Sequence, residues 1–215
     1  MTPLDLETVR DPTSLQRRIQ ELSSQLRAAD PSLLAAWSGS VLDPAGSCLH
    51  TAVMGQPVLV TLPDYRVVDA QSRQEAHVYT QAMMLYHLTT TRGAPVTGRW
   101  VSFRELPDGG FYHLAFQGYT GREIVRAYGE DLPAFCHVAE QLGGRWEAVG
   151  NAGYAFDALP RVPLLIVYWL GEENLPSSAQ VLFDASAGLH LPVDACALLG
   201  SILARRLIAG KQLPR

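Results

Sequence analysis

The feature that most constrains the fold is an unbroken apolar run from Val162 to Leu170. Its β-branched and aromatic residues favour a strand, and it is too short to span a bilayer. A strand without alternation of apolar and polar residues has both faces covered by other elements. After the acidic loop at 171–174, an alternating run from Gln180 to Asp184 predicts a second strand. The pattern therefore predicts a buried central strand, a neighbouring strand and an acidic loop between them.

The rest of the chain alternates helical and β-rich stretches. Apolar spacing, with cap-like Asp, Pro and Gly residues, predicts helices at about 12–29, 75–89, 121–129, 132–142 and from Pro192 onward. Short apolar runs separated by Gly and Pro predict a β-meander at 38–70. No repeat or linker-like change of composition interrupts the path. We therefore expect an α+β fold in a single domain over residues 1–215, with a mixed, largely antiparallel sheet flanked by helices.

The helix expected at 75–89 carries apolar residues on two faces. Tyr79 and Met83 share one face, and Met84 and Leu88 lie close to the opposite one. Such a helix either lies between two layers of structure or presents one face to a partner protein. Both interpretations stay open at this point.

The stretch Thr97–Gly118 predicts a β-hairpin, because residues alternate on both sides of the turn-forming sequence Pro107–Gly110. A four-residue loop would place Arg104 opposite His113. Two such neighbours favour an acidic group between them, either a carboxylate of the chain or an anionic ligand. A salt bridge within the chain is the simpler of these two alternatives.

Composition and charge argue against several classes of protein. The net charge is −4, with 17 basic and 21 acidic residues and no basic cluster interleaved with aromatic residues, which argues against nucleic-acid binding. The first residues lack the pattern of a signal peptide, so we expect a cytoplasmic protein. Arg205, Arg206 and Lys211 are expected to complement the dipole of the last helix.

The three cysteines do not form a C-x-x-C pair, which argues against a disulfide framework and a local zinc or iron–sulfur site. Cys48 and His50 point to one side of an expected strand and could hold a metal only with remote ligands. A buried thiol beside an ordinary imidazole is the simpler interpretation. No motif identifies a resident metal, a cofactor or an oligomeric state.

Two groups of residues are candidates for chemistry. Glu172, Glu173 and Asp184 could act as metal ligands or as acid–base groups, provided that the two strands bring them to one end of the sheet. A polar pocket facing the acidic loop could bind a small anionic ligand. Its expected members are Trp100, Arg104, Glu105, His113, Trp169 and Ser186.

Two blocks of the sequence resemble a known family. They are GRWVSFRELPDGGFYHLAF at Gly98–Phe116 and LPRVPLLIVYWLGEENLPSSAQVLFDASAGLHLP at Leu159–Pro192. The resemblance is to the bacterial and archaeal domain of unknown function family 3786, and it covers about residues 58–199. It implies no established activity. Some relatives are similar to proteins of corrinoid and iron–sulfur one-carbon metabolism and carry a cysteine-rich cluster-binding segment. This chain lacks that segment, and Glu172 stands where the family often has Asp.

Three functional hypotheses follow. The first is an accessory or small-ligand-binding domain without catalysis, with the association to corrinoid or iron–sulfur metabolism that the resemblance implies. The second is a carboxylate-based, metal-dependent hydrolase or lyase. The third is a protein–protein docking module that uses the helix at 75–89.

Overall fold

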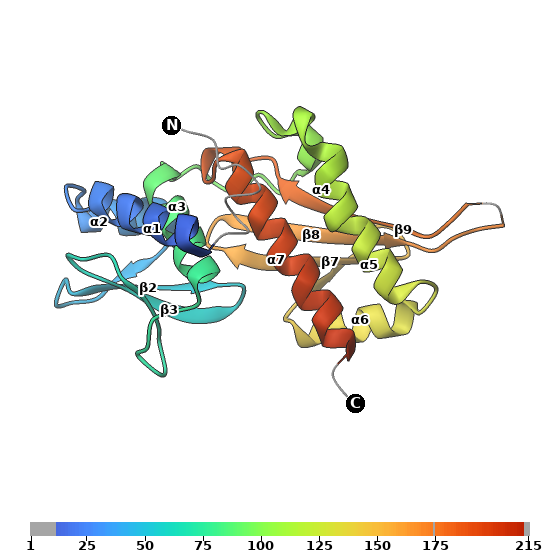
Figure 1. The fold of residues 1–215 in the computed structure, drawn as a ribbon, viewed down its shortest axis with the longest axis horizontal. Helices are drawn as coiled ribbons and strands as arrows, with labels where there is room; N and C mark the ends of the chain where they lie inside the picture. The colour runs from blue at the N-terminus through green and yellow to red at the C-terminus, as the bar shows by residue number, and fades with distance from the viewer. Residues whose placement is uncertain (1–11, 174, 213–215) are drawn as a thin grey trace.

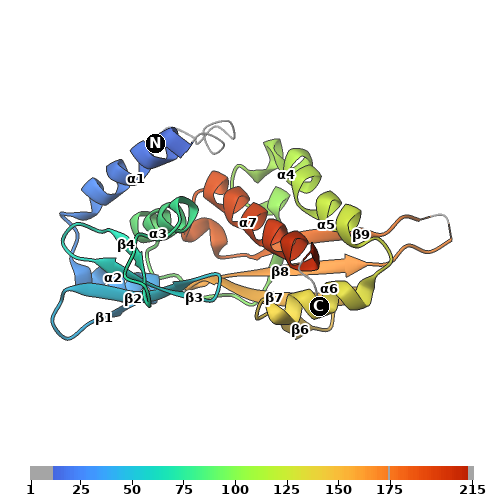
Figure 2. The ribbon, with the colours of Figure 1, turned by 60° about the horizontal axis from the view of Figure 1, so that its bottom comes forward.

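The computed structural model describes residues 12–173 and 175–212. Two antiparallel sheets lie toward opposite ends of the elongated molecule, with helices packed over them (Figures 1 and 2). The predicted α+β class is confirmed. The sheet prediction is refined, because the strands form two sheets and every described strand pair is antiparallel.

The first sheet belongs to residues 12–90, which we call the N-terminal part. Its strands follow the predicted meander in the order β1-β2-β3-β4. The strands are β1 (Val41–Leu42), β2 (Cys48–Val53), β3 (Gln56–Thr61) and β4 (Val67–Asp69). The helices of this part are α1 (Pro12–Leu26), α2 (Pro31–Ser38) and α3 (Val78–Thr90).

Helix α3 is covered on all sides by the chain itself. Every residue from Gln81 to Leu88 is buried. The apolar stripe of α1, which includes Leu15 and Leu22, packs against one side of α3, and β2, β4 and α7 contact it elsewhere. The two apolar faces seen in the sequence therefore reflect a helix between layers.

The second sheet belongs to residues 100–212, the C-terminal part, and has the order β5-β9-β8-β7-β6. The predicted central strand is confirmed as β8 (Val162–Trp169), in which residues 164–168 are all buried. The other strands are β5 (Trp100–Ser102), β6 (Arg145–Glu147), β7 (Ala152–Leu159) and β9 (Ser178–Asp184). Helices α4 (His113–Tyr119), α5 (Gly121–Tyr128), α6 (Leu132–Gln141) and α7 (Val193–Gln212) complete this part, with α5 and α7 over one face of the sheet (Figure 2).

The hairpin predicted at Thr97–Gly118 is wrong. Strand β5 pairs with β9, with Val101 opposite Phe183, and the chain then enters two short 3-10 helices (Phe103–Glu105 and Gly109–Phe111) before α4. Arg104 therefore does not pair with His113. The helical path brings the Phe103 and Phe116 rings into a stack with centroids 4.3 Å apart, so burial of both rings takes precedence over the alternating pattern.

One continuous cluster of buried side chains extends through both parts, from Leu15 on α1 to Leu207 on α7. Buried polar contacts add to this packing, one within the N-terminal part and one that reaches the C-terminal part. His87 of α3 hydrogen-bonds through Nε2 to the carbonyl oxygen of Ser38 (3.0 Å), and Thr91 Oγ1 lies 2.8 Å from Nδ1 of His190. None of the helices in the described ranges combines the length and apolar character that a bilayer crossing requires.

Candidate functional site

Asp184 is a buried carboxylate that fastens the end of β9 to the chain before β5. It accepts hydrogen bonds from N–H and O–H groups of Thr97, Gly98 and Ser186 at 2.6–3.1 Å. Burial disfavours the charged form of Asp184, but these donors outweigh burial and lower its pKa. An ionised carboxylate whose oxygens are already occupied in this way serves the local structure.

Glu172 and Glu173 lie at the far end of the same strand pair. Both are exposed in the connection between β8 and β9, where Glu172 forms an isolated bridge with Leu175. Because β9 spans Ser178–Asp184, its two ends are about 20 Å apart at the usual rise per residue. The structure therefore separates Asp184 from the two glutamates.

The residues expected to form a polar pocket are also dispersed. Trp100 and Trp169 pack on a small apolar cluster on one face of the second sheet. Glu105 accepts two hydrogen bonds from Ser102 (2.7 and 2.8 Å), Ser186 donates to Asp184, and Nδ1 of His113 bonds to the Gly110 carbonyl (2.8 Å). Arg104 is exposed. The six residues therefore do not form one pocket.

Cys48 and His50 do lie together on β2, with Sγ and Nε2 3.6 Å apart. Within residues 12–173 and 175–212, no group of three or more His, Cys, Asp or Glu side chains is placed to hold a metal ion. The remote ligands that a metal site at Cys48 would need are therefore not supplied by the described chain.

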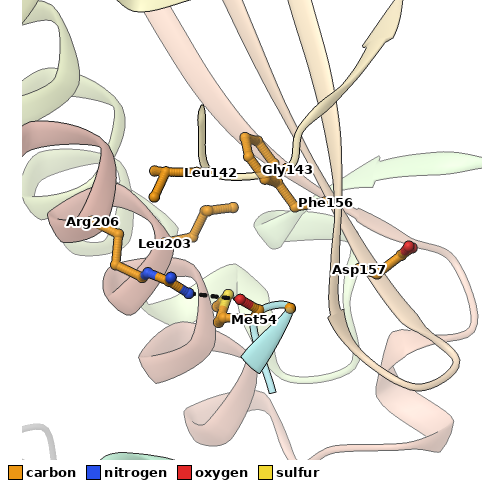
Figure 3. A pocket seen from close by; sticks show the side chains of 8 residues that line it. Met54, Leu142, Gly143, Phe156, Asp157, Leu203 and Arg206 are labelled. Carbon is orange, nitrogen blue, oxygen red and sulfur yellow. Dashed lines mark hydrogen bonds between the residues drawn. The ribbon is translucent and has the colours of Figure 1, made fainter. Parts of the chain in front are cut away.

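A different pair of cavities lies where the two parts meet, around the turn between β2 and β3. Met54 and Gly55 form this turn, with φ of 51° and 74°. Positive φ at both central residues is the geometry of a tight two-residue hairpin. The Met54 N–H donates to the Ala158 carbonyl (2.8 Å), and Arg206 Nη1 donates to the Met54 carbonyl (2.8 Å; Figure 3). The C-terminal part thus holds the turn at both polar groups of Met54.

The larger cavity, which we call the cationic cleft, has a volume of ≈ 290 Å³. It is bounded by the β2–β3 turn, the first turn of α3 and the second half of α7. Its lining residues are Val53, Met54, Gln56, His77, Tyr79, Thr80, Ile202, Arg205 and Arg206. No acidic residue is among them.

Electrostatics make the cationic cleft attractive to an anion. Arg206 is half-buried and burial lowers its pKa, whereas Arg205 is exposed. None of the ion pairs of the described chain includes either guanidinium. His77 caps α3, accepting from the Tyr79 N–H at 3.4 Å, and the N-terminal end of a helix carries partial positive charge. Arg205, Arg206 and the start of α3 therefore line one cavity, and no described carboxylate is among its lining residues.

The smaller cavity, which we call the apolar pocket, has a volume of ≈ 110 Å³ and adjoins the cationic cleft at Met54 and Arg206. Side chains of Met54, Leu142, Phe156 and Leu203 form its apolar walls (Figure 3). Gly55, Gly143, Asp157 and Arg206 complete its lining. The two cavities therefore meet at one hydrogen bond, which joins α7 to the β2–β3 turn.

Neither cavity was predicted from the sequence. Arg205 and Arg206 were expected to complement the dipole of the last helix, and the pattern did not single out Met54 or Gly55. The available local signal was Gly55 between two alternating apolar runs, which is typical of a hairpin turn. No pattern in the sequence connects that turn with residues about 150 positions later.

Comparison with protein families identifies the chain. The family model described as Domain of unknown function (DUF3786) matches residues 30–206. The chain belongs to this family. The match to DUF3786 confirms the resemblance found in the sequence and extends it in both directions from residues 58–199. It includes the β2–β3 turn, His77, Tyr79, Arg205 and Arg206, so the cationic cleft lies within the DUF3786 region. No curated protein and no solved structure matches the chain.

Proposed function

We propose that this DUF3786 chain is a ligand-binding domain that holds a small anion in the cationic cleft. The observation that carries the proposal is that Arg205 and Arg206 line one cavity and that neither forms an ion pair with a described carboxylate. A half-buried guanidinium is stabilised by an anion that replaces part of its lost hydration. Thr80 and Gln56 add groups able to donate hydrogen bonds to such an anion.

The proposal keeps the anionic ligand expected from the sequence but moves its site. The expected pocket around Arg104 and His113 depended on a hairpin that does not form. An accessory role in corrinoid or iron–sulfur one-carbon metabolism and a cytoplasmic setting are further parts of the proposal. They rest on the family resemblance and on the sequence alone.

The two alternative functions have less support from the described residues. A metal-dependent hydrolase or lyase would need Glu172, Glu173 and Asp184 in one site, and β9 holds them apart. A docking module based on α3 would need an exposed apolar face, and α1 and the first sheet cover that helix. We therefore favour ligand binding.

The test measures the melting temperature of the protein with inorganic phosphate, sulfate or citrate at constant ionic strength, with chloride as the reference. Binding to the native state alone raises the melting temperature. We expect Arg205→Gln to weaken the apparent affinity for the stabilising anion about tenfold, because a charge-assisted hydrogen bond is lost. Arg122→Gln, on the exposed face of α5, removes the same charge away from the cleft and should leave the affinity unchanged. No stabilisation by any of the three anions, or equal weakening by both substitutions, would refute the proposal.

A further inference from the structure

The cationic cleft and the apolar pocket share Met54 and Arg206, so a single ligand can occupy both. We infer that the ligand is amphipathic, with an anionic head in the cationic cleft and a compact apolar group in the apolar pocket. This inference rests on the proposed function, because it takes the cationic cleft as the site of the head group.

The walls of the apolar pocket favour hydrocarbon. Met54, Phe156 and Leu203 are buried, at 8%, 4% and 2% exposure, and Leu142 is half-buried. The surface that these side chains show to the pocket would lose water on contact with an apolar group. Removal of such surface from water is the main favourable contribution to binding of an apolar group.

Neither charged residue of the apolar pocket is placed to bind a second head group. Asp157 points away from the other lining side chains (Figure 3) and forms a two-pronged ion pair with Arg145 at 2.5 and 3.1 Å. Arg206 directs Nη1 to the Met54 carbonyl, which orients its guanidinium between the two cavities. An anion bound on the cleft side of Arg206 would therefore lie next to the apolar pocket, within reach of it for a short apolar substituent.

The size of the apolar pocket limits the apolar group. An apolar cavity of about 150 Å³ is large enough to bind benzene. The pocket, at ≈ 110 Å³, is somewhat smaller and shares Met54 and Arg206 with the cationic cleft. It therefore suits a ring or a branched chain of a few carbon atoms, such as that of an aryl phosphate or a short branched carboxylate, and excludes a long acyl chain.

The experiment compares inorganic phosphate with phenyl phosphate by isothermal titration calorimetry. The two probes share the head group and differ in the ring. We expect phenyl phosphate to bind about tenfold tighter to the unsubstituted protein, the lower end of what burial of a phenyl group contributes. Leu142→Phe should fill the pocket, remove this advantage and leave the affinity for inorganic phosphate unchanged.

The controls separate this inference from the proposed function. Leu203→Phe fills the pocket from α7 and repeats the test if Leu142→Phe lowers the melting temperature too far for titration. Equal affinities for the two probes in the unsubstituted protein, or an unchanged advantage of phenyl phosphate in the filled variants, would overturn the amphipathic ligand. In that case, phosphate binding that is weakened by Arg205→Gln would leave the proposed function standing. Binding of neither probe would overturn both.

Discussion

Arg206 donates a hydrogen bond of 2.8 Å to the carbonyl oxygen of Met54, a residue 152 positions earlier in the chain. Met54 adopts a left-handed conformation that costs a residue with a Cβ about 1–2 kcal/mol. Its N–H is bound to the Ala158 carbonyl, so both polar groups of its backbone are satisfied by the C-terminal part. These contacts fix the turn that lines both cavities, and the shape of both cavities depends on them.

Arg206→Ala should lower the free energy of unfolding by about 1–2 kcal/mol, because a hydrogen bond from a charged donor and the packing of the alkyl stem are lost. Arg205→Ala, one residue earlier on the exposed side of α7, should change it by less than about 0.5 kcal/mol. Urea denaturation of both variants measures the difference. Equal effects of the two substitutions would show that the contact with Met54 does not stabilise the fold.

Gly109→Ala should be strongly destabilising. A Cβ at Gly109 would lie 1.9 Å from the carbonyl oxygen of Phe103, a distance that only a shift of backbone can relieve. We expect a loss of at least about 3 kcal/mol or failure to fold. Gly110→Ala is the matched control, because a Cβ there meets no atom within 4 Å. Circular dichroism melting curves compare the two, and similar curves would contradict the close approach at Gly109.

Asp184→Asn should destabilise the junction between β5 and β9 by about 2–4 kcal/mol. The amide of Asn offers only one acceptor oxygen, and its NH₂ would face N–H and O–H donors of Thr97 and Ser186 that now bind a carboxylate. Glu172→Gln, at the exposed connection between β8 and β9, is the matched charge change and should be nearly neutral. Chemical denaturation tests this pair. A neutral Asp184→Asn variant would contradict a stabilising role for the carboxylate at this junction.

Acid should destabilise the protein through His87. Burial lowers the pKa of His87 from 6.5 to about 4, and burial with nearby Arg161 also lowers the pKa of His190. Between pH 6.5 and pH 4, His87 binds more protons in the unfolded chain than in the folded chain. The stability that the neutral imidazole contributes is therefore complete above about pH 6.5 and is lost as the pH falls through 4. The loss due to His87 is on the order of 3 kcal/mol. The pKa of Asp184 is lowered, so its protonation reduces stability only below pH 3.8, the ordinary pKa of an aspartate.

Denaturation at pH 7 and pH 5 measures this dependence. His87→Gln should reduce the difference in unfolding free energy between the two pH values, whereas His137→Gln, on the exposed surface of α6, should preserve it. The His190 contribution remains in both variants. A His87→Gln variant with the pH dependence of the unsubstituted protein would contradict a neutral, buried imidazole at this position.

Much of the fold could be predicted because its main elements have local signatures. The unbroken run at Val162–Leu170 requires cover on both faces, and β8 has it. The stripe of α1 and the meander of the first sheet were likewise evident from spacing. The segment after Ser102 was not, because its alternation also fits two short helical turns. Only the stacking of Phe103 on Phe116 and the close approach at Gly109 decide between them, and both depend on tertiary contacts.

The candidate site could not be predicted from the sequence for a similar reason. Its charged groups lie on α7, its turn lies between β2 and β3, and its helix start belongs to α3. No short motif contains more than one of these elements. A guanidinium near the end of a helix is also explained by the helix dipole. The position of Arg206 in the sequence therefore does not indicate a binding site, and only its contact with Met54 does so.

The packing of α1 on α3 has a practical consequence for protein production. A polypeptide cut to the matched residues 30–206 would lack Leu15 and Leu22, which cover α3. It would also lose Leu207, whose carbonyl accepts from the Tyr128 hydroxyl at 2.6 Å. Such a fragment would expose a broad hydrophobic surface and should aggregate when it is expressed. Recombinant versions of this protein should therefore include helix α1, which precedes the matched region.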